Sequence, residues 1–561
     1  MKPFHCQILM FLMFVAAFGC QTNREAAQIQ QELEAINLSR GEIALCGTNQ
    51  FGEVKFGLSC SEKVRDDFNL ATALLHSFEY VEAEKVFARV IDADPSCLMA
   101  YWGVAMSNYH PLWAPPTTDE LTKGSKTIKL ARTLEATADR DREYLEAVAT
   151  IFDDFENLDH KTRVGKFVQA AEAIYKKYPD DKEAAIFYAL ALRASADPAD
   201  KSFTNQLRAG EILESLFPNE PNHPGVAHYL IHNYDYPELA EKGLDAARRY
   251  ASIASNSAHA QHMPSHIFTR LGLWDESIQS NTNSMAAAKC YTENLGRTGH
   301  WDQELHGLDY IVYAYLQQGR DREANFQVEY LATIDSVFPL TFVNAYTFAA
   351  VPVRYALERK DWNQAASLEL RPASFPWEKF EWQTGIHHFG KLLGYVHLND
   401  IKAAKVELET LKKIEASLKE SKKDYEANQT AIQIAASEAS ILFASGKRKE
   451  GLARMQAAVD MEYATEKHSV TPGEVVPTLE LLGDMHMQTG DYAKAMNAYV
   501  ANLKIRPGRF NSVYGAASAA KKSGDKVNAR KYFEQLLELT KASDKSRPEI
   551  KEALSFTGES V

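Results

Sequence analysis

Residues 481–536, LLGDMHMQTGDYAKAMNAYVANLKIRPGRFNSVYGAASAAKKSGDKVNARKYFEQL, decide the fold of this chain. Gly490 and Gly524 are 34 residues apart, and so are Ala495 and Ala529. A repeat of this length is typical of stacked helix pairs, which bury one continuous core between neighbouring repeats. The stretch therefore predicts two consecutive pairs of antiparallel helices.

The same spacing recurs along most of the chain. One unit near the N-terminus contains Leu70, Ala83 and Phe87, and a middle unit contains Gly319 and Ala324. Weaker units are centred on the small residues Ala170, Ala209, Ala246, Ser277, Ala365, Ala404 and Gly451. This pattern resembles the tetratricopeptide repeat. We therefore expect an all-α chain, an α-solenoid or superhelix of about ten tetratricopeptide-like helix pairs.

Composition agrees with this expectation and excludes other classes of protein. The 561 residues are 45% hydrophobic, with only 28 Gly and 20 Pro to interrupt long helices. The net charge of −13 excludes a basic protein that binds nucleic acid. No GxSxG, P-loop or dinucleotide-binding glycine pattern stands out.

The first twenty residues predict export. Residues 8–19, ILMFLMFVAAFG, are too short for a membrane span, which needs about 20 residues, but suit a signal-peptide core. The run ends at Cys20, which resembles the lipid-modified cysteine of bacterial lipoproteins; an ordinary cleaved signal peptide is the alternative. We expect a cell-envelope lipoprotein facing the periplasm or the cell surface, in contact with the membrane only through the lipid on Cys20.

The chain divides into segments of different character. We expect a signal peptide at 1–19, a polar tether and N-terminal cap at 20–60, N-terminal repeats at 61–220, central histidine-rich repeats at 221–335, repeats with insertions at 336–470, C-terminal repeats at 471–545 and a tail at 546–561. Four cysteines follow Cys20, and an exported protein can join them in disulfides. Cys46–Cys60 and Cys60–Cys97 are rival pairings, with Cys290 further along the chain.

Histidines are concentrated in the central repeats. Eight of the 17 lie between His223 and His306, in the segments HPGVAHYLIH (223–232), HAQHMPSH (259–266) and HWDQELHGLDY (300–310). His228 and His232 are four residues apart, as are His262 and His266, so each pair shares one face of a helix. The two pairs are separated by 34 residues and therefore occupy equivalent positions in consecutive repeats.

Resemblance to the tetratricopeptide repeat implies that these positions line a concave groove. Imidazoles with a carboxylate suit a divalent transition metal such as Zn, Cu or Fe. We therefore predict a metal site among His228, His232, His262, His266, His306 and Asp309. We expect His259, Arg270 and Tyr313 to contribute to binding along the same groove.

Two other interpretations of these residues stay open. His228 or His266 could hold a buried structural hydrogen bond beside Tyr229 and Phe268. A groove without metal could instead bind peptides or acidic groups through its histidines and Arg270. Pro264 favours a helix that begins near His262, because proline suits a first turn better than a helix interior.

Several motifs together resemble a family of exported bacterial tetratricopeptide proteins. They are LLHSFEY (74–80), NHPGVAHYLIH (222–232), HMPSHIF (262–268) and HGLDYIVYAYLQ (306–317). The resemblance supports the solenoid and implies no particular reaction. We expect the concave groove to bind a protein, peptide or small ligand. A metal ion held by the histidines is one way in which the groove would bind it. The alternative is a metal-dependent enzyme that uses the same residues; its catalytic residues are not identified.

Overall fold

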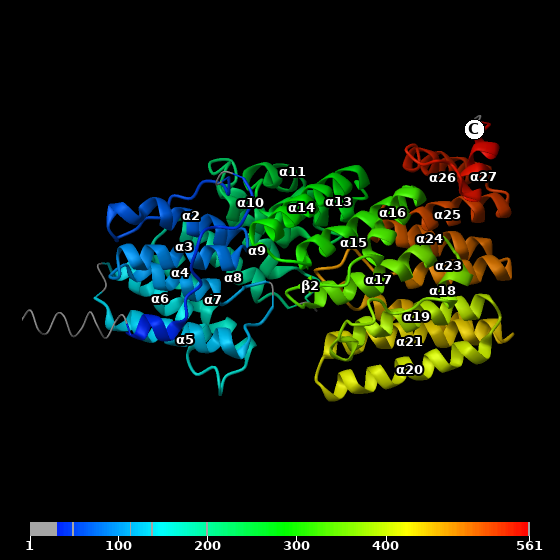
Figure 1. The fold of residues 1–561 in the computed structure, drawn as a ribbon. Helices are drawn as coiled ribbons and strands as arrows, with labels where there is room; N and C mark the ends of the chain where they lie inside the picture. Colours follow the sequence, from blue (N-terminus) through cyan, green and yellow to red (C-terminus); the bar gives the residue numbers. More distant parts are fainter. Residues whose placement is uncertain (1–30, 48–49, 113, 136–137, 198–199, 559–561) are drawn as a thin grey trace, which may run out of the picture. The chain divides into compact units, whose positions relative to one another are not determined.

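The structure, a computed structural model, describes residues 31–47, 50–112, 114–135, 138–197 and 200–558 (Figure 1). The predicted signal peptide at 1–19 and Cys20 lie outside these residues. The chain forms two compact units. Unit 1 contains residues up to 44, 51–196 and 203–229, and unit 2 contains residues 45–50, 197–202 and 230 onward.

Unit 1 consists of helix pairs in which each helix packs against the next. Its elements are the 3-10 turn η1 (Glu62–Val64), α2 (Arg65–His76), α3 (Tyr80–Ala93), α4 (Leu98–Ser107), α5 (Thr118–Thr133), α6 (Asp139–Phe152), α7 (His160–Lys177), α8 (Lys182–Ala194) and α9 (Thr204–Leu216). The first helices of successive pairs also pack together, since α2 contacts α4 and α4 contacts α6. This is the arrangement expected of stacked repeats. Helix α10 (Pro224–Tyr234) begins in unit 1 and ends in unit 2.

Unit 2 continues the same construction with longer helices. It contains η2 (Ala240–Gly243), α11 (Leu244–Ile253), α12 (Ala258–His262), α13 (Pro264–Leu271), α14 (Trp274–Asn294), α15 (Asp302–Gln317), α16 (Asp321–Ala332), α17 (Phe342–Glu358), α18 (Trp362–Ala366), η3 (Trp377–Lys379), α19 (Glu381–His397), α20 (Ile401–Glu420), α21 (Asp424–Ala444), α22 (Arg448–Tyr463), α23 (Thr478–Thr489), α24 (Tyr492–Ile505), α25 (Phe510–Ser523), α26 (Lys526–Leu539) and α27 (Pro548–Thr557). The short strands β1 (His300–Trp301) and β2 (Val337–Phe338) pair in parallel. Figure 1 shows α19, α20 and α21 side by side in this unit, and each of these helices packs against the other two.

The repeated glycines mark where the first helix of a pair ends. Gly272, Gly490 and Gly524 cap α13, α23 and α25 with φ values of 71°, 79° and 85°, a left-handed conformation that glycine adopts without strain. The aspartates that follow two of them, Asp491 and Asp525, cap the next helices by accepting hydrogen bonds from backbone N–H groups. The sequence signal that predicted the repeat is therefore the signal that ends one helix and starts the next. The predicted all-α helical-repeat fold is confirmed.

Segments near both ends of the chain are packed against the repeats. The expected tail at 546–561 contains α27, because Ile550, Ala553 and Leu554 are buried on one face of that helix, which packs against α26. In the segment expected to be a polar tether and N-terminal cap, 20–60, Phe51 and Phe56 are almost fully buried, as residues of a cap would be. Apolar side chains spaced for burial hold both segments against the repeats.

Disulfides connect all four cysteines that follow the N-terminal region. Cys60 pairs with Cys97, which was one of the two rival predictions. Cys46 pairs with Cys290, across 244 residues of sequence, a pairing that was not predicted. Of the helices that the structure describes, none combines the length and the apolar character that crossing a bilayer requires.

A candidate metal centre in unit 2

The second histidine pair sits at a break between two short helices. Helix α12 ends at His262, and α13 begins at Pro264, which has no N–H group to donate in a helix interior. His259 lies within α12, where Ser257 caps the helix through its hydroxyl. The break preserves the four-residue spacing, because His262 and His266 still bring their Nε2 atoms within 2.9 Å of each other.

Three buried imidazoles from two parts of the chain converge at this point. The ligand atoms of His262, His266 and His306 lie within 4.8 Å of one another. The rings of His262 and His306, the latter from α15, have centroids only 3.9 Å apart. All three side chains are at most 5% exposed. The cluster therefore has the composition and spacing of a His₃ metal site.

The tautomer of His262 is set by Asn281 on α14. Asn281 Nδ2 donates to the carbonyl of Ser277 at 2.8 Å, so its Oδ1 atom is the one that faces His262. That oxygen can only accept, and it lies 2.6 Å from His262 Nδ1. The proton of neutral His262 is therefore on Nδ1, and its Nε2 carries a lone pair.

The tautomer of His266 is set in the same way by Asp235, directly after α10. Asp235 Oδ2 lies 2.9 Å from His266 Nδ1, and Oδ1 accepts from Arg270 Nε at 2.8 Å. Burial acts to raise the pKa of Asp235, but Lys467, Arg270 and His266 outweigh it and hold that pKa well below its usual range. The ionised carboxylate can only accept a hydrogen bond, so the proton of neutral His266 is on Nδ1 and its Nε2 also presents a lone pair.

Two lone pairs consequently face each other across 2.9 Å. Two acceptors at this distance repel unless a cation lies between or beside them. A shared proton is disfavoured, because burial, followed by its histidine neighbours, holds the pKa of His262 well below the usual value, and burial also lowers the pKa of His266. Two imidazoles bound to one tetrahedral zinc ion at about 2.05 Å would have nitrogens about 3.3 Å apart, so a small opening of this pair would admit the ion.

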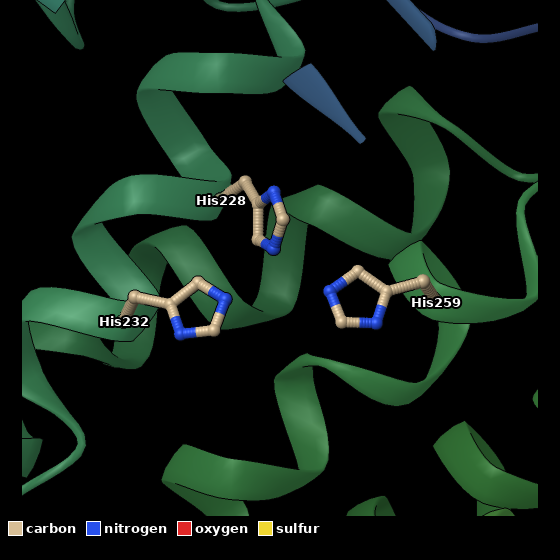
Figure 2. A group of neighbouring side chains, drawn as sticks. All are labelled: His228, His232 and His259. Atoms are coloured by element: carbon tan, nitrogen blue, oxygen red, sulfur yellow. The ribbon is translucent and has the colours of Figure 1, made fainter. Parts of the chain in front are cut away.

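A second pair of imidazoles lies next to this cluster in unit 2. Figure 2 shows His232 on α10 and His259 on α12, each with a ring nitrogen directed into the space between them. Their ligand nitrogens lie within 4.8 Å of each other, and their ring centroids are 6.2 Å apart. The His232 ring is 6.4 Å from the ring of His266. Five of the predicted site histidines are thus neighbours in this unit.

His228 is placed in unit 1 by its contacts. Its Nδ1 donates to the backbone carbonyl of His76 at 2.6 Å, and its ring lies 4.3 Å from that of Phe78. It is fully buried. Nδ1 of His228 therefore forms the buried structural hydrogen bond that was one interpretation of the sequence. His228 lies one helical turn before His232 on α10.

Asp309 does not reach the imidazoles. Its carboxylate forms a buried ion pair with Arg354 on α17, and Arg354 also donates to the carbonyl of Gly473 at 3.0 Å. Tyr310, the next residue, takes the place predicted for Asp309, with its ring 4.7 Å from that of His262. One residue along a helix rotates a side chain by about 100°, so the two neighbours face different partners.

Arg270 and Tyr313, predicted as groove residues, line one cavity of about 330 Å³. Arg270 also donates to Asp235 and so contacts the group that orients His266. Tyr313 accepts from Arg509 Nη1 at 3.1 Å. The rest of the cavity is strongly charged, with Lys467, Glu474 and Arg506 among its lining residues. His259, the third predicted groove residue, is part of the imidazole group instead.

The sequence did not predict a second cluster, in unit 1. His76, Glu183 and His223 are buried, with ligand atoms within 4.8 Å of one another. Glu183 accepts from His76 Nε2 at 3.0 Å and from His223 Nε2 at 2.9 Å. Gly225 permits this packing, since a Cβ atom there would lie 2.5 Å from His76 Nδ1. In the sequence, His223 of the HPG motif was the one member of this cluster that stood out. Glu183 lies 40 residues before it, so no local spacing links the two residues.

The comparison with family models identifies one repeat near the C-terminus. The family model described as tetratricopeptide repeat matches residues 476–509. Among solved structures, human IFIT1 in a dimer with PPP-AAAA is similar over 86% of this chain and 96% of that chain, with 12% identity and a TM-score of 0.34. No curated protein matches the sequence.

Proposed function

We propose that this chain is a helical-repeat scaffold that holds a first-row transition-metal ion, zinc or copper, on His262, His266 and His306. The observation that carries the proposal is the pair of Nε2 lone pairs that face each other at 2.9 Å in a buried site. Imidazole is a preferred ligand of both ions. Asn281 and Asp235 act as the outer hydrogen-bond partners that metal-bound histidines use to fix their tautomer.

The ligand set also supports a second candidate function, a metal-dependent enzyme. Structural zinc sites use four protein ligands, whereas catalytic sites use three and leave a position for water or substrate. Three imidazoles converge here, and Asp309 is engaged by Arg354. A fourth position open to water would supply Lewis-acid or hydrolytic chemistry.

A protein or peptide partner fits the scaffold part of the proposal. Tetratricopeptide-type repeats form extended surfaces suited to binding other chains. The cavity at Arg270 and Tyr313 carries both cations and carboxylates, so it suits a partner segment with charged side chains of both signs. The metal would stabilise the adjacent helices that form one wall of this cavity.

Export and lipid anchoring at Cys20 are part of the proposal. Two disulfides, Cys60–Cys97 and Cys46–Cys290, support an oxidising compartment such as the periplasm or the cell surface. The test is labelling of the full chain with radioactive palmitate in a bacterial host. The wild-type chain should incorporate label, and the Cys20→Ser variant should not; equal labelling of both would reject the anchor.

Metal content is the direct test of the central proposal. The chain from Gln21 onward is purified, and its zinc and copper are measured by mass spectrometry as isolated and after reconstitution. We expect stoichiometric metal in the wild type and loss of the tightly held ion in a His262→Ala, His266→Ala variant. The matched control is His387→Ala, His388→Ala, a neighbouring histidine pair on α19. Wild-type protein without stoichiometric metal after reconstitution would reject the proposal.

A further inference from the structure

The imidazole pair His232–His259 resembles the first half of a second metal site. Its ligand nitrogens are within 4.8 Å, a separation that one ion with nitrogen bonds of about 2.0–2.1 Å can bridge after a small closure. Figure 2 shows the two rings approaching from different helices, α10 and α12, with the gap between their nitrogens. The centroids of the two rings are 6.2 Å apart and their planes differ by 24°.

This pair lies directly beside the first site. The ring of His232 is 6.4 Å from the ring of His266. An ion lies about 3 Å from the centre of an imidazole that binds it. Ions on these two rings would therefore be close neighbours within one group of five imidazoles. In known two-metal sites, ions about 3.5–4 Å apart share an oxygen ligand.

The two parts of the group differ in burial and in ligand number. His262, His266 and His306 are all buried, whereas His232 is only half-buried. The pair supplies two imidazoles and the trio supplies three. An ion on the pair would therefore keep more positions for water or an oxygen-donor ligand and would exchange faster with solvent.

Resting on the proposed function, we propose that His232 and His259 bind a second transition-metal ion, so that unit 2 contains a dinuclear centre. The trio holds the retained ion, and the pair holds the exchangeable one. Ligands with two oxygen donors, such as a carboxylate or a phosphate, are the chemical class that such a pair of ions would bridge.

The experiment uses zinc as the probe on the chain from Gln21 onward. Metal-free protein is loaded with Zn²⁺, freed of excess by gel filtration and analysed by mass spectrometry, and release to a chromogenic chelator is followed over time. We expect two zinc ions per chain, released in a fast and a slow phase. The His232→Ala, His259→Ala variant should hold one ion and keep only the slow phase, while the His387→Ala, His388→Ala control should match the wild type.

The outcomes separate this inference from the proposed function. One zinc ion per wild-type chain, released in one slow phase, would overturn the second site and leave the first intact. Two ions retained in the His232→Ala, His259→Ala variant would also overturn it. No zinc in the wild type would overturn both. Because the wild-type stoichiometry and the two release phases are read on unmodified protein, the test holds even where a variant fails to fold.

Discussion

Each unit contains a buried group of three potential metal ligands, and the hydrogen bonds around the two groups differ. In unit 1, the N–H of Val226 donates to His223 Nδ1 at 3.4 Å, so His223 Nε2 carries the proton that goes to Glu183. His76 donates from Nε2 to the same carboxylate, and its Nδ1 accepts from the Tyr229 hydroxyl at 2.9 Å. Every proton in this group has an acceptor.

In unit 2, the hydrogen bonds instead leave two acceptor nitrogens facing each other. His262 and His266 each donate from Nδ1 and meet through Nε2. Among the residues that the structure describes, the Tyr310 hydroxyl is a distant donor to this nitrogen pair, 3.4 Å from His266 Nε2. The ligand atoms of both groups therefore lie within the same distance of one another, 4.8 Å. What distinguishes the candidate metal site in unit 2 from the hydrogen-bonded network in unit 1 is which ring nitrogens carry protons.

The largest expected effect tests this distinction directly. Replacing Glu183 by Gln should leave metal content unchanged, whereas the His262→Ala, His266→Ala variant should lose the tightly held ion. The physical reason is that Glu183 is occupied by two imidazole protons, while the Nε2 lone pairs have no proton. The metal content of both purified variants is measured by mass spectrometry. Loss of metal in Glu183→Gln would contradict the assignment of the metal site to unit 2.

The next effect concerns stability of unit 1. Glu183→Ala leaves two buried imidazole N–H groups without their acceptor, at a cost of about 3 kcal/mol in the free energy of unfolding. Urea unfolding followed by circular dichroism measures the loss, and Glu183→Gln, which keeps one acceptor oxygen, should lose less. A chelator should not change the difference between wild type and Glu183→Ala; a change would indicate that metal also binds in unit 1.

A smaller effect is expected from the residues that orient the unit 2 imidazoles. Asn281→Ala removes the acceptor of His262 Nδ1 and should weaken metal affinity about 10–100-fold. Competition with a chromogenic chelator measures the affinity. Asn281→Asp supplies a carboxylate in the same place and should restore or increase it. Equal affinity in all three proteins would show that this hydrogen bond does not orient a ligand.

The smallest effect comes from a histidine outside both clusters. Burial, His388 and Lys391 lower the pKa of His387 to about 4, below the ordinary value of 6.5. The unfolded chain therefore binds this proton first, so the stability due to neutral His387 is present above pH 6.5 and is lost as pH falls from 6.5 through 4. His387→Gln should reduce the decrease in unfolding free energy between pH 7 and pH 4.5. An unchanged pH dependence would contradict the assignment.

Sequence periodicity was sufficient for the fold and for part of the site. The 34-residue spacing predicts the helix pairs, because glycine and aspartate at fixed positions end one helix and begin the next. The four-residue spacing likewise predicts that His262 and His266 meet, since it places both on one face. The prediction for helix α15 was less accurate, because the repeat spacing placed Asp309 at the metal site. In the structure Asp309 pairs with Arg354, and the next residue, Tyr310, packs against the imidazoles.

The hydrogen-bond partners that give the site its character were beyond prediction. Asp235 and Asn281 are ordinary polar residues in sequence, and their roles depend on the packing of α10, α13 and α14. Glu183 joins His76 and His223 from a helix more than 100 residues after His76. Periodicity reports which face of a helix is buried, whereas these contacts depend on which helix covers that face.

The Cys46–Cys290 disulfide makes a covalent ring of everything between these two residues. All of unit 1 beyond residue 50 lies within that ring. A protease that cuts once inside it, at any loop from 51 to 229, therefore releases no fragment until the bond is reduced. A chain closed in this way can be nicked and still remain one molecule, and a single cut would be visible on a gel only in the presence of a reducing agent.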